Sequence, residues 1–256
     1  MNLLIISDLH IGTNDHFETF GWKADEFILA LEKIRTEEKI DRIILNGDVF
    51  ELYKYSFEEI CHKNPEIINY LLKDPCITYI KGNHDAVCPY GTNSLEFINT
   101  EGKSIYIEHG HCADFLNGTR LGRKIQTLGF NLLRFGIKNK FIFKTYKRIV
   151  LFNEAVNRIP KKYDSIKYLT HALRLLKNYD MVILGHTHKI ESHKTYYSSS
   201  KKHYINSGTC SMGRFQGIIV NTNTMKYETL KFKNLKELLK DYRKSKPIIR
   251  ELALTA

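Results

Sequence analysis

Five short segments of this sequence hold the residues best suited to chemistry. In each, a run of apolar residues ends at a group of Asp, Asn or His side chains. The groups are Asp8 with His10, Asp48 with Glu51, Asn83 with His84 and Asp85, His109 with His111, and His186 with His188. One such group alone is ordinary at the end of a strand. Five of them after apolar runs indicate one shared polar site.

The side chains of these groups offer carboxylate oxygens, imidazole nitrogens and one amide oxygen. This donor set suits Mn²⁺, Fe or Zn²⁺, and the lack of thiolates argues against a structural zinc site. The candidate ligands are too many for one tetrahedral ion. They are enough for two ions that share a bridging carboxylate. We therefore expect two divalent metal ions, with manganese as the first choice and iron or zinc as alternatives.

The elements that must position these groups form a βαβα pattern in the first hundred residues. Apolar runs predict strands at 3–7, 42–46, 77–81, 104–108 and 181–184, and hairpin-like strands around 191–197, 203–207 and 217–232. Helical spacing predicts helices at 22–39, 57–73 and 234–244. In open α/β sheets the strand ends open onto a common crevice, so we expect the polar groups to converge there.

The segment 115–179 differs from the rest of the chain in charge. It contains 15 Lys or Arg residues and two acidic residues, whereas the formal net charge of the whole chain is +11. The rest is therefore close to neutral, and the segment should face something anionic. We interpret it as a basic helical cap inserted into an α/β core made of 1–114 and 180–256.

Two amphipathic helices are expected within this cap. The apolar positions of the first recur at intervals of four, three and four residues, which is typical of one helical face; they are Leu121, Ile125, Leu128 and Leu132. The second is expected to present Ile166, Leu169, Leu173 and Leu176 on one face.

The order of the polar groups supplies a family resemblance. Along the chain they read Asp-x-His, Gly-Asp-x-x-Glu, Gly-Asn-His-Asp, His-Gly-His and Gly-His-Thr-His. This order resembles the calcineurin-like metallophosphoesterases, and the resemblance covers the chain outside the cap. It implies a four-layer α/β/β/α sandwich with an inserted helical cap, and an enzyme that hydrolyses phosphoric esters or anhydrides.

The same resemblance implies a role for each residue. One metal ion would be held by Asp8, His10 and His188, the other by Asn83, His109 and His186, and Asp48 would bridge the two. His84 would lie beside the scissile phosphate as a catalytic residue, with Asp85 orienting its ring. Two cations would lower the pKa of a shared water, whose hydroxide attacks phosphorus. Glu51 is expected to support the site without ligating metal.

The substrate is less well specified than the reaction. The Gly-Asp-Val-Phe-Glu-Leu form, the short length and the basic insertion after the His-Gly-His loop resemble the UDP-2,3-diacylglucosamine hydrolases, which cleave a pyrophosphate. That subfamily typically has arginine at the position of His84. The alternatives are a nuclease or nucleotide phosphodiesterase that uses the basic cap, and a non-catalytic binding scaffold, which would be expected to have broken motifs.

The cap has two expected partners. Its basic amphipathic surface could lie on an anionic membrane and accept a lipid substrate, or it could follow a nucleic-acid backbone. The alternative without such a partner is that the phenylalanines of the cap form only a small core of their own. Residues assigned to substrate binding are His111, Arg120, Arg123 and Lys124. The oligomeric state is left open.

Five cysteines at irregular spacing suggest reduced thiols. The short apolar start indicates a buried strand and not a signal peptide. We therefore expect a cytoplasmic protein that is peripheral to a membrane if the cap binds lipid.

Overall fold

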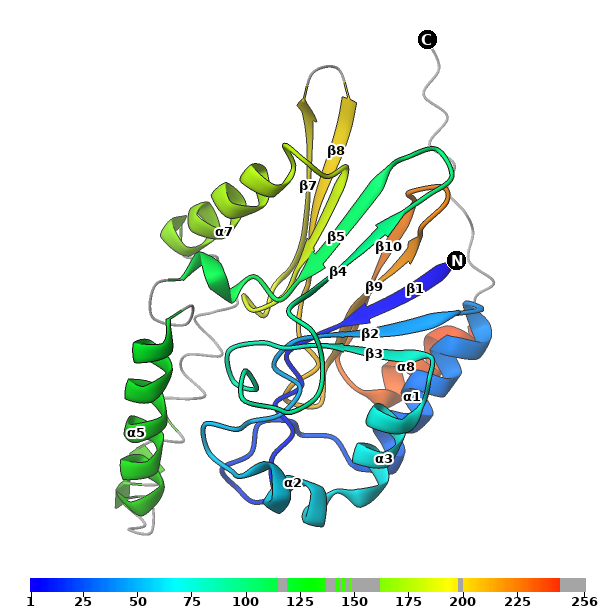
Figure 1. Ribbon diagram of the computed structural model, residues 1–256. Helices are drawn as coiled ribbons and strands as arrows, with labels where there is room; N and C mark the ends of the chain where they lie inside the picture. The colour runs from blue at the N-terminus through cyan, green and yellow to red at the C-terminus, as the bar shows by residue number, and fades with distance from the viewer. Residues whose placement is uncertain are drawn as a thin grey trace.

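The computed structural model describes residues 1–114, 119–136, 162–197 and 200–244, together with 141, 142, 144, 145 and 148. Within these ranges, two five-stranded sheets pack face to face and helices cover their outer sides (Figure 1). The predicted four-layer α/β/β/α sandwich is confirmed.

The first sheet has the strand order β10–β9–β1–β2–β3. Its strands are β1 (Asn2–Ile6), β2 (Arg42–Asn46), β3 (Ile77–Ile80), β9 (Phe215–Asn221) and β10 (Tyr227–Phe232). β1, β2 and β3 are parallel, whereas β9 runs antiparallel to both β1 and β10. The three parallel strands therefore end at the same edge of the sheet.

The second sheet has the strand order β4–β5–β6–β8–β7. Its strands are β4 (Ser94–Ile98), β5 (Ser104–Glu108), β6 (Met181–Leu184), β7 (Ile190–Tyr197) and β8 (Ser200–Ser207). β5, β6 and β8 are parallel, and the edge strands β4 and β7 are antiparallel to their neighbours.

Alternation along the strands produces the layers. In β1, Leu3 and Ile5 belong to the apolar cluster between the two sheets, whereas Leu4 and Ile6 belong to the cluster beneath the helices. Successive side chains of a strand point to opposite faces, so one apolar run serves two cores. The outer side of the first sheet is covered by α1 (Ala24–Glu37), α2 (Phe57–Lys63), α3 (Pro65–Lys73) and α8 (Leu235–Lys244).

The predicted helix at 57–73 is two helices. α2 ends at Lys63, and α3 starts at Pro65. Asn64 between them has φ −131° and ψ 48°, which is not helical. Proline restricts the residue before it and has no N–H to continue the helical hydrogen bonds, so the break falls at this point.

The outer side of the second sheet is covered by α7 (Lys162–Leu175). Tyr168, Ala172 and Leu176 are buried at intervals of four residues, and the last two pack with residues of β6 and β8. The face predicted for this helix is therefore partly wrong, because Ile166 and Leu173 are 52% and 43% exposed. Tyr168 and Ala172 are buried in their stead, and Ala172 packs against the sheet.

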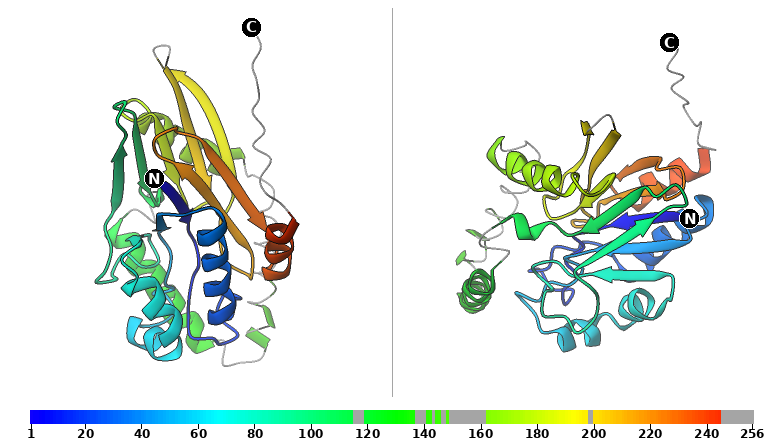
Figure 2. Two further views of the ribbon diagram at one scale, coloured as in Figure 1. Left: turned by 90° about the vertical axis from the view of Figure 1, so that its right-hand side faces the viewer. Right: turned by 45° about the horizontal axis from the view of Figure 1, so that its top comes forward.

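The cap range 115–179 includes two described helices in different surroundings. α7 forms the fourth layer of the sandwich, whereas α5 (Arg120–Gly136) lies outside the two sheets (Figures 1 and 2). The boundaries of an inserted cap remain a prediction. No helix in the described ranges is long and apolar enough to cross a bilayer.

Candidate metal centre

The predicted ligands follow five parallel strands that come from both sheets. Asp8, Asp48 and Asn83 come after β1, β2 and β3 of the first sheet, and His109 and His186 come after β5 and β6 of the second. We call Asp8, His10, Asp48, Asn83, His109, His186 and His188 the ligand cluster. Its residues come from chain segments up to 180 positions apart, and the parallel strand ends bring them together.

The backbone at the ligand cluster has a rare conformation. Five of its members have left-handed φ values between 53° and 70°; they are Asp8, His10, Asp48, His186 and His188. Residues with side chains seldom adopt this region, and such strain concentrates at functional sites. Backbone hydrogen bonds from Asp8 N to Gly47 O and from His10 N to Asp48 O, both 3.0 Å long, hold two of these turns together.

Two glycines allow the ligands to approach the backbone. A Cβ on Gly82 would lie 2.1 Å from Asp48 Oδ1, and a Cβ on Gly47 would lie 2.4 Å from the His109 ring. Real Cβ atoms essentially never lie so close to another atom, so any side chain at either position would displace a candidate ligand.

The first set of donor atoms comes from Asp8, His10 and His188. His188 Nε2 lies 3.2 Å from Asp8 Oδ1 and 3.3 Å from His10 Nε2. All three ligand atoms lie within 4.8 Å of one another. Two imidazole nitrogens and a carboxylate oxygen thus face one point, as a cation requires.

The second set comes from Asp48, His109 and His186, whose ligand atoms also lie within 4.8 Å of one another. His109 Nε2 is 3.1 Å from Asp48 Oδ2, and the rings of His109 and His186 are 5.2 Å apart. His109 Nδ1 lies 2.8 Å from Asn46 O, which orients the ring and directs Nε2 towards Asp48.

Four side-chain atoms of the ligand cluster are buried without a hydrogen-bond partner among the described residues; His10 Nδ1 lies 3.4 Å from Glu51 Oε2, and the other three are proposed ligand atoms. These three are Asp8 Oδ1, Asn83 Oδ1 and His109 Nε2. A buried polar atom without a partner is costly, and native proteins almost always satisfy it. Divalent cations would satisfy all three atoms, so the residues fit a metal centre, including the amide oxygen predicted from sequence.

The charges of the cluster also favour cations. Burial alone would raise the pKa of Asp8, but His188 and His109 outweigh it and lower that pKa to about 2. The pKa of Asp48 is likewise well below its usual value despite burial, because His109 and His84 lie close by. Both carboxylates are therefore anionic at neutral pH and available to metal ions.

His84 lies at the edge of the cluster. Its backbone N–H donates to Asp48 Oδ1 at 2.9 Å, and its ring lies against that of Tyr53, with centroids 4.4 Å apart. Its Nδ1 is 2.7 Å from Glu51 Oε1. Burial would lower the pKa of His84, but Glu51 and Asp48 outweigh it and raise that pKa to about 9.

Asp85 does not orient the His84 ring as the sequence predicted. Its Oδ1 accepts from Gly82 N at 2.6 Å, and its Oδ2 accepts from Val49 N at 2.6 Å and from Phe50 N at 3.3 Å. Asp85 thus ties together the loops that carry Asn83 and Asp48. The carboxylate beside the His84 ring is that of Glu51.

Three further residues support the site and were not singled out from the sequence. Lys54 is buried, with Nζ 3.2 Å from Glu51 Oε2. On α7, the ring of Tyr168 lies edge-on to that of His186 at 5.4 Å, and His171 Nε2 is 2.6 Å from Glu108 Oε1. The nearness of Lys54 to Glu51 in sequence was an available signal, whereas α7 is remote from its partners in sequence.

The residues predicted to bind substrate lie in different places. The ring of His111 is 5.6 Å from that of His109, beside the ligand cluster. Arg120 and Lys124 are exposed on α5, and the side chain of Arg123 lies outside the described residues. A substrate role for all four remains a prediction.

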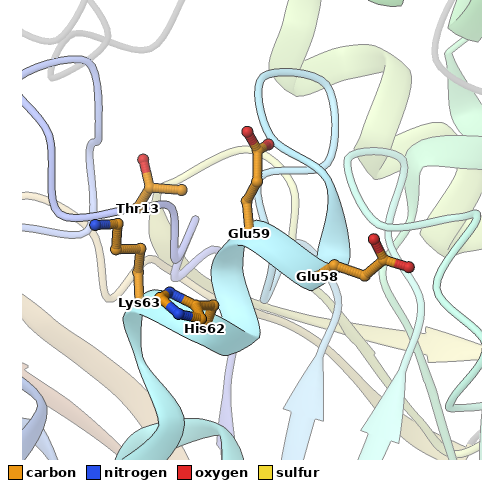
Figure 3. Close-up of a pocket in the computed structure, with 5 residues that line it drawn as sticks. All are labelled: Thr13, Glu58, Glu59, His62 and Lys63. Carbon is orange, nitrogen blue, oxygen red and sulfur yellow. The ribbon is translucent and has the colours of Figure 1, made fainter.

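A cavity of about 390 Å³ lies elsewhere, on α2. It is lined by Thr13, Glu58, Glu59, His62 and Lys63 (Figure 3). No member of the ligand cluster lines it. Its side chains are those of a helix surface and a neighbouring loop, so it adds nothing to the metal centre.

A sandwich of two mixed sheets with Asp, Asn and His ligands at the parallel strand ends defines a metal-dependent phosphoesterase class. The sequence model of the calcineurin-like phosphoesterases matches residues 1–190. The chain belongs to this family, and it is a metal-dependent phosphoester hydrolase.

The solved structures that match the chain are distant in sequence. A novel archaeal phosphodiesterase is 16% identical with a TM-score of 0.42, and covers 91% of this chain and 100% of its own. A dimetal phosphatase from Danio rerio is 9% identical with a TM-score of 0.46, with coverage of 91% and 99%. The phosphoesterase YfcE from E. coli is 11% identical with a TM-score of 0.40, with coverage of 91% and 100%. No curated protein matches the chain.

Proposed function

We propose that this chain hydrolyses a phosphodiester or pyrophosphate bond with two divalent cations, Mn²⁺ being the first choice. The observation that carries the proposal is a set of buried donor atoms that make no hydrogen bond within the described part of the chain: Asp8 Oδ1, Asn83 Oδ1 and His109 Nε2. These oxygens and nitrogens suit Mn²⁺, Fe or Zn²⁺.

In this reaction the ligand cluster would bind the two metal ions. Asp8, His10 and His188 would hold one ion, Asn83, His109 and His186 the other, and Asp48 would bridge them. When bound, a pair of divalent ions lowers the pKa of a water to near neutral and neutralises the charge that develops on the phosphoryl oxygens. The left-handed turns and the hydrogen bonds of Asp85 fix the ligands beforehand, so little reorganisation is needed.

His84 is the proposed proton donor to the leaving oxygen. Its Nδ1 contacts Glu51, which leaves Nε2 available for a proton on the substrate side. In the metal-free protein, Glu51 and Asp48 raise the pKa of His84 to about 9, so the imidazole holds a proton at neutral pH before metal binds. A protonated imidazole can both donate to the leaving group and stabilise negative charge on the phosphoryl group.

We propose a UDP-2,3-diacylglucosamine-type pyrophosphate as the first substrate to test. The Gly47–Leu52 sequence and the basic segment after His111 support it. The same basic segment also favours a nucleotide or nucleic-acid diester, which carries the same anionic group. The deciding experiment is a hydrolysis panel with Mn²⁺ that compares this lipid nucleotide, nucleotides, simple diesters and single-stranded DNA.

The bridging role of Asp48 is tested by Asp48→Ala. We expect no detectable hydrolysis of bis-p-nitrophenyl phosphate and fewer than two metal ions per chain by elemental analysis. Asp25→Ala, which removes an exposed carboxylate from α1, is the matched control and should behave as wild type. Near-normal turnover of Asp48→Ala with Mn²⁺ would refute the role, and a native protein without metal or activity would refute the proposed function.

A further inference from the structure

One face of α5 exposes apolar side chains along the helix. The exposed fractions run from 57% to 75% for five residues at intervals of four, three, four and three; they are Leu121, Ile125, Leu128, Leu132 and Phe135. Because a helix repeats every 3.6 residues, these side chains form one stripe. We call them the α5 apolar face.

Such a face is unusual for a protein surface. Single exposed apolar residues are common, but a contiguous apolar patch marks a site of interaction. The face runs from Leu121 to Phe135, so it extends over about 21 Å of the helix. The helix lies beside the sandwich and not within its layers (Figures 1 and 2).

The charge of α5 restricts what can cover this face. Its sequence contains four basic residues and no acidic residue, and Arg120 and Lys124 are exposed beside the apolar stripe. The surrounding segment 115–179 has 15 basic and two acidic residues. A second copy of the chain would bring like charges together. A nucleic acid would match the charge. Its phosphate backbone would not bury the four aliphatic side chains and the one aromatic side chain of this face.

An anionic lipid surface matches both properties. A helix with one apolar face and basic residues around it lies in the plane of a membrane, with its apolar side chains among the acyl chains and its charges at the headgroups. α5 is too short and too polar to span the bilayer, in agreement with the absence of a spanning helix from the described ranges.

We propose that α5 docks the protein onto anionic lipid bilayers through the α5 apolar face. This docking rests on the surface of α5 alone and is independent of the hydrolytic function proposed for the ligand cluster.

The test is sedimentation of the full chain with vesicles. Wild type is mixed with vesicles of phosphatidylcholine and phosphatidylglycerol (3:1) and with vesicles of phosphatidylcholine alone. We expect binding to the anionic vesicles that is at least about tenfold stronger than to the neutral ones, because each basic residue near the surface adds to the affinity. Failure of wild type to bind the anionic vesicles would overturn the proposal.

Two neighbouring substitutions separate the contribution of the α5 apolar face to vesicle binding from the effect of an added negative charge. Leu132→Glu and Asn131→Glu add the same negative charge to adjacent exposed positions of α5, but only the first lies on the apolar face. Leu132→Glu should weaken vesicle binding at least about tenfold more than Asn131→Glu. Equal effects would overturn the proposal.

Three further measurements distinguish lipid from a second copy of the chain, lipid from nucleic acid, and membrane docking from the proposed hydrolytic function. A change in oligomeric state of Leu132→Glu by light scattering, without vesicle binding by wild type, would assign the face to a second copy. Binding of single-stranded DNA that Leu132→Glu abolishes, again without vesicle binding, would assign it to nucleic acid. Hydrolysis of bis-p-nitrophenyl phosphate should be unchanged in Leu132→Glu, so loss of docking and loss of the hydrolytic function are read separately.

Discussion

Glu51 is buried and lies between three groups of the site. Its carboxylate is 2.7 Å from His84 Nδ1, 3.4 Å from His10 Nδ1 and 3.2 Å from Lys54 Nζ. Burial would raise the pKa of Glu51, but His84 and Lys54 outweigh it and hold that pKa well below its usual value. One carboxylate thus positions a proposed metal ligand and the proposed proton donor together.

Glu51→Gln should lower kcat about 10- to 100-fold, the usual cost of removing a partner that orients a ligand or catalytic imidazole. The amide cannot stabilise a protonated His84, so the pH range of activity should also move to lower pH. A pH–rate profile with Mn²⁺ measures both effects. Glu37→Gln, at an exposed position on α1, is the control, and an unchanged profile for Glu51→Gln would contradict this role.

Gly82 tests how closely the ligands are packed. A Cβ at this position would lie 2.1 Å from Asp48 Oδ1, so Gly82→Ala must displace the bridging carboxylate or its own loop. We expect loss of at least one metal ion per chain and loss of activity. Gly129→Ala on α5, where a Cβ meets nothing within 4 Å, is the control. Full metal content in Gly82→Ala would count against the bridging position of Asp48.

The structure brings together the Asp and His side chains of the ligand cluster, as the strand pattern predicts, whereas the contacts of their supporting residues are less predictable from sequence. Asp8, Asp48 and His109 each follow an apolar strand, so the pattern that predicts the strands also predicts their convergence. Residue spacing does not predict that Glu51, and not Asp85, contacts the His84 ring. Asp85 is next to His84 in sequence, but its side chain turns to the backbone of another loop.

At the scale of elements, α7 fixes one side of the metal centre. Tyr168 packs edge-on to the ring of His186, and His171 pairs with Glu108, the residue before His109. Lys167 Nζ is also 3.3 Å from Asp114 Oδ2. The helix therefore holds the loops of two proposed ligands of the same ion.

Tyr168→Leu should weaken binding of that ion about tenfold, because the ring of His186 loses the side chain that limits its orientation. Activity should recover at high Mn²⁺ concentration. Tyr168→Phe keeps the ring and should restore the affinity, whereas Leu173→Ala on the exposed side of α7 should have no effect. Mn²⁺ titration by calorimetry measures the affinity, and equal affinities for the Leu and Phe variants would exclude this positioning role.

Strands with a continuous apolar run were predictable, and elements governed by tertiary contacts were not. β2, β5 and β6 have the predicted bounds; β6 is buried throughout, β2 is buried after Arg42, and β5 alternates between half-buried and buried residues. β4 was missed because it is an edge strand whose residues are largely half-exposed or exposed, which leaves no apolar run. The inward face of α7 differs from the prediction because Ala172 packs against β6 and β8 and Tyr168 lies against the His186 ring, while the more apolar Ile166 and Leu173 are exposed.

At the scale of the whole molecule, two sheets place buried charges of both signs at one edge. Burial would lower the pKa of His109, but Asp48 and Asp8 outweigh it and raise that pKa to about 10. The imidazolium forms of His109 and His84 thus balance the carboxylates in the metal-free protein. Divalent cations would take over this role, and His109 must lose its proton to bind one.

This exchange predicts that the stability of the metal-free protein falls as pH rises, and that the stabilisation by metal grows over the same range. His84 and His109 have folded-state pKa values of about 9 and 10, above the ordinary value of 6.5. The stability that they contribute without metal is therefore complete below pH 6.5 and is lost as pH rises through 9 and 10. The melting temperature in EDTA should accordingly fall between pH 6.5 and pH 9.

With Mn²⁺ this fall should be smaller, because affinity gains up to about tenfold per pH unit for each proton that binding releases, and this gain offsets the stability that His109 loses. Mn²⁺ at about 100 times its Kd adds about 2.7 kcal/mol to the free energy of unfolding. For a chain of this size that corresponds to an increase in melting temperature of about 5–10 °C. Thermal melts with EDTA and with a fixed Mn²⁺ concentration, at pH 6.5 and pH 9, measure both trends. A stabilisation by Mn²⁺ that shrinks as pH rises would mean that His109 does not bind the ion, since only a ligand that must lose its proton makes the effect grow.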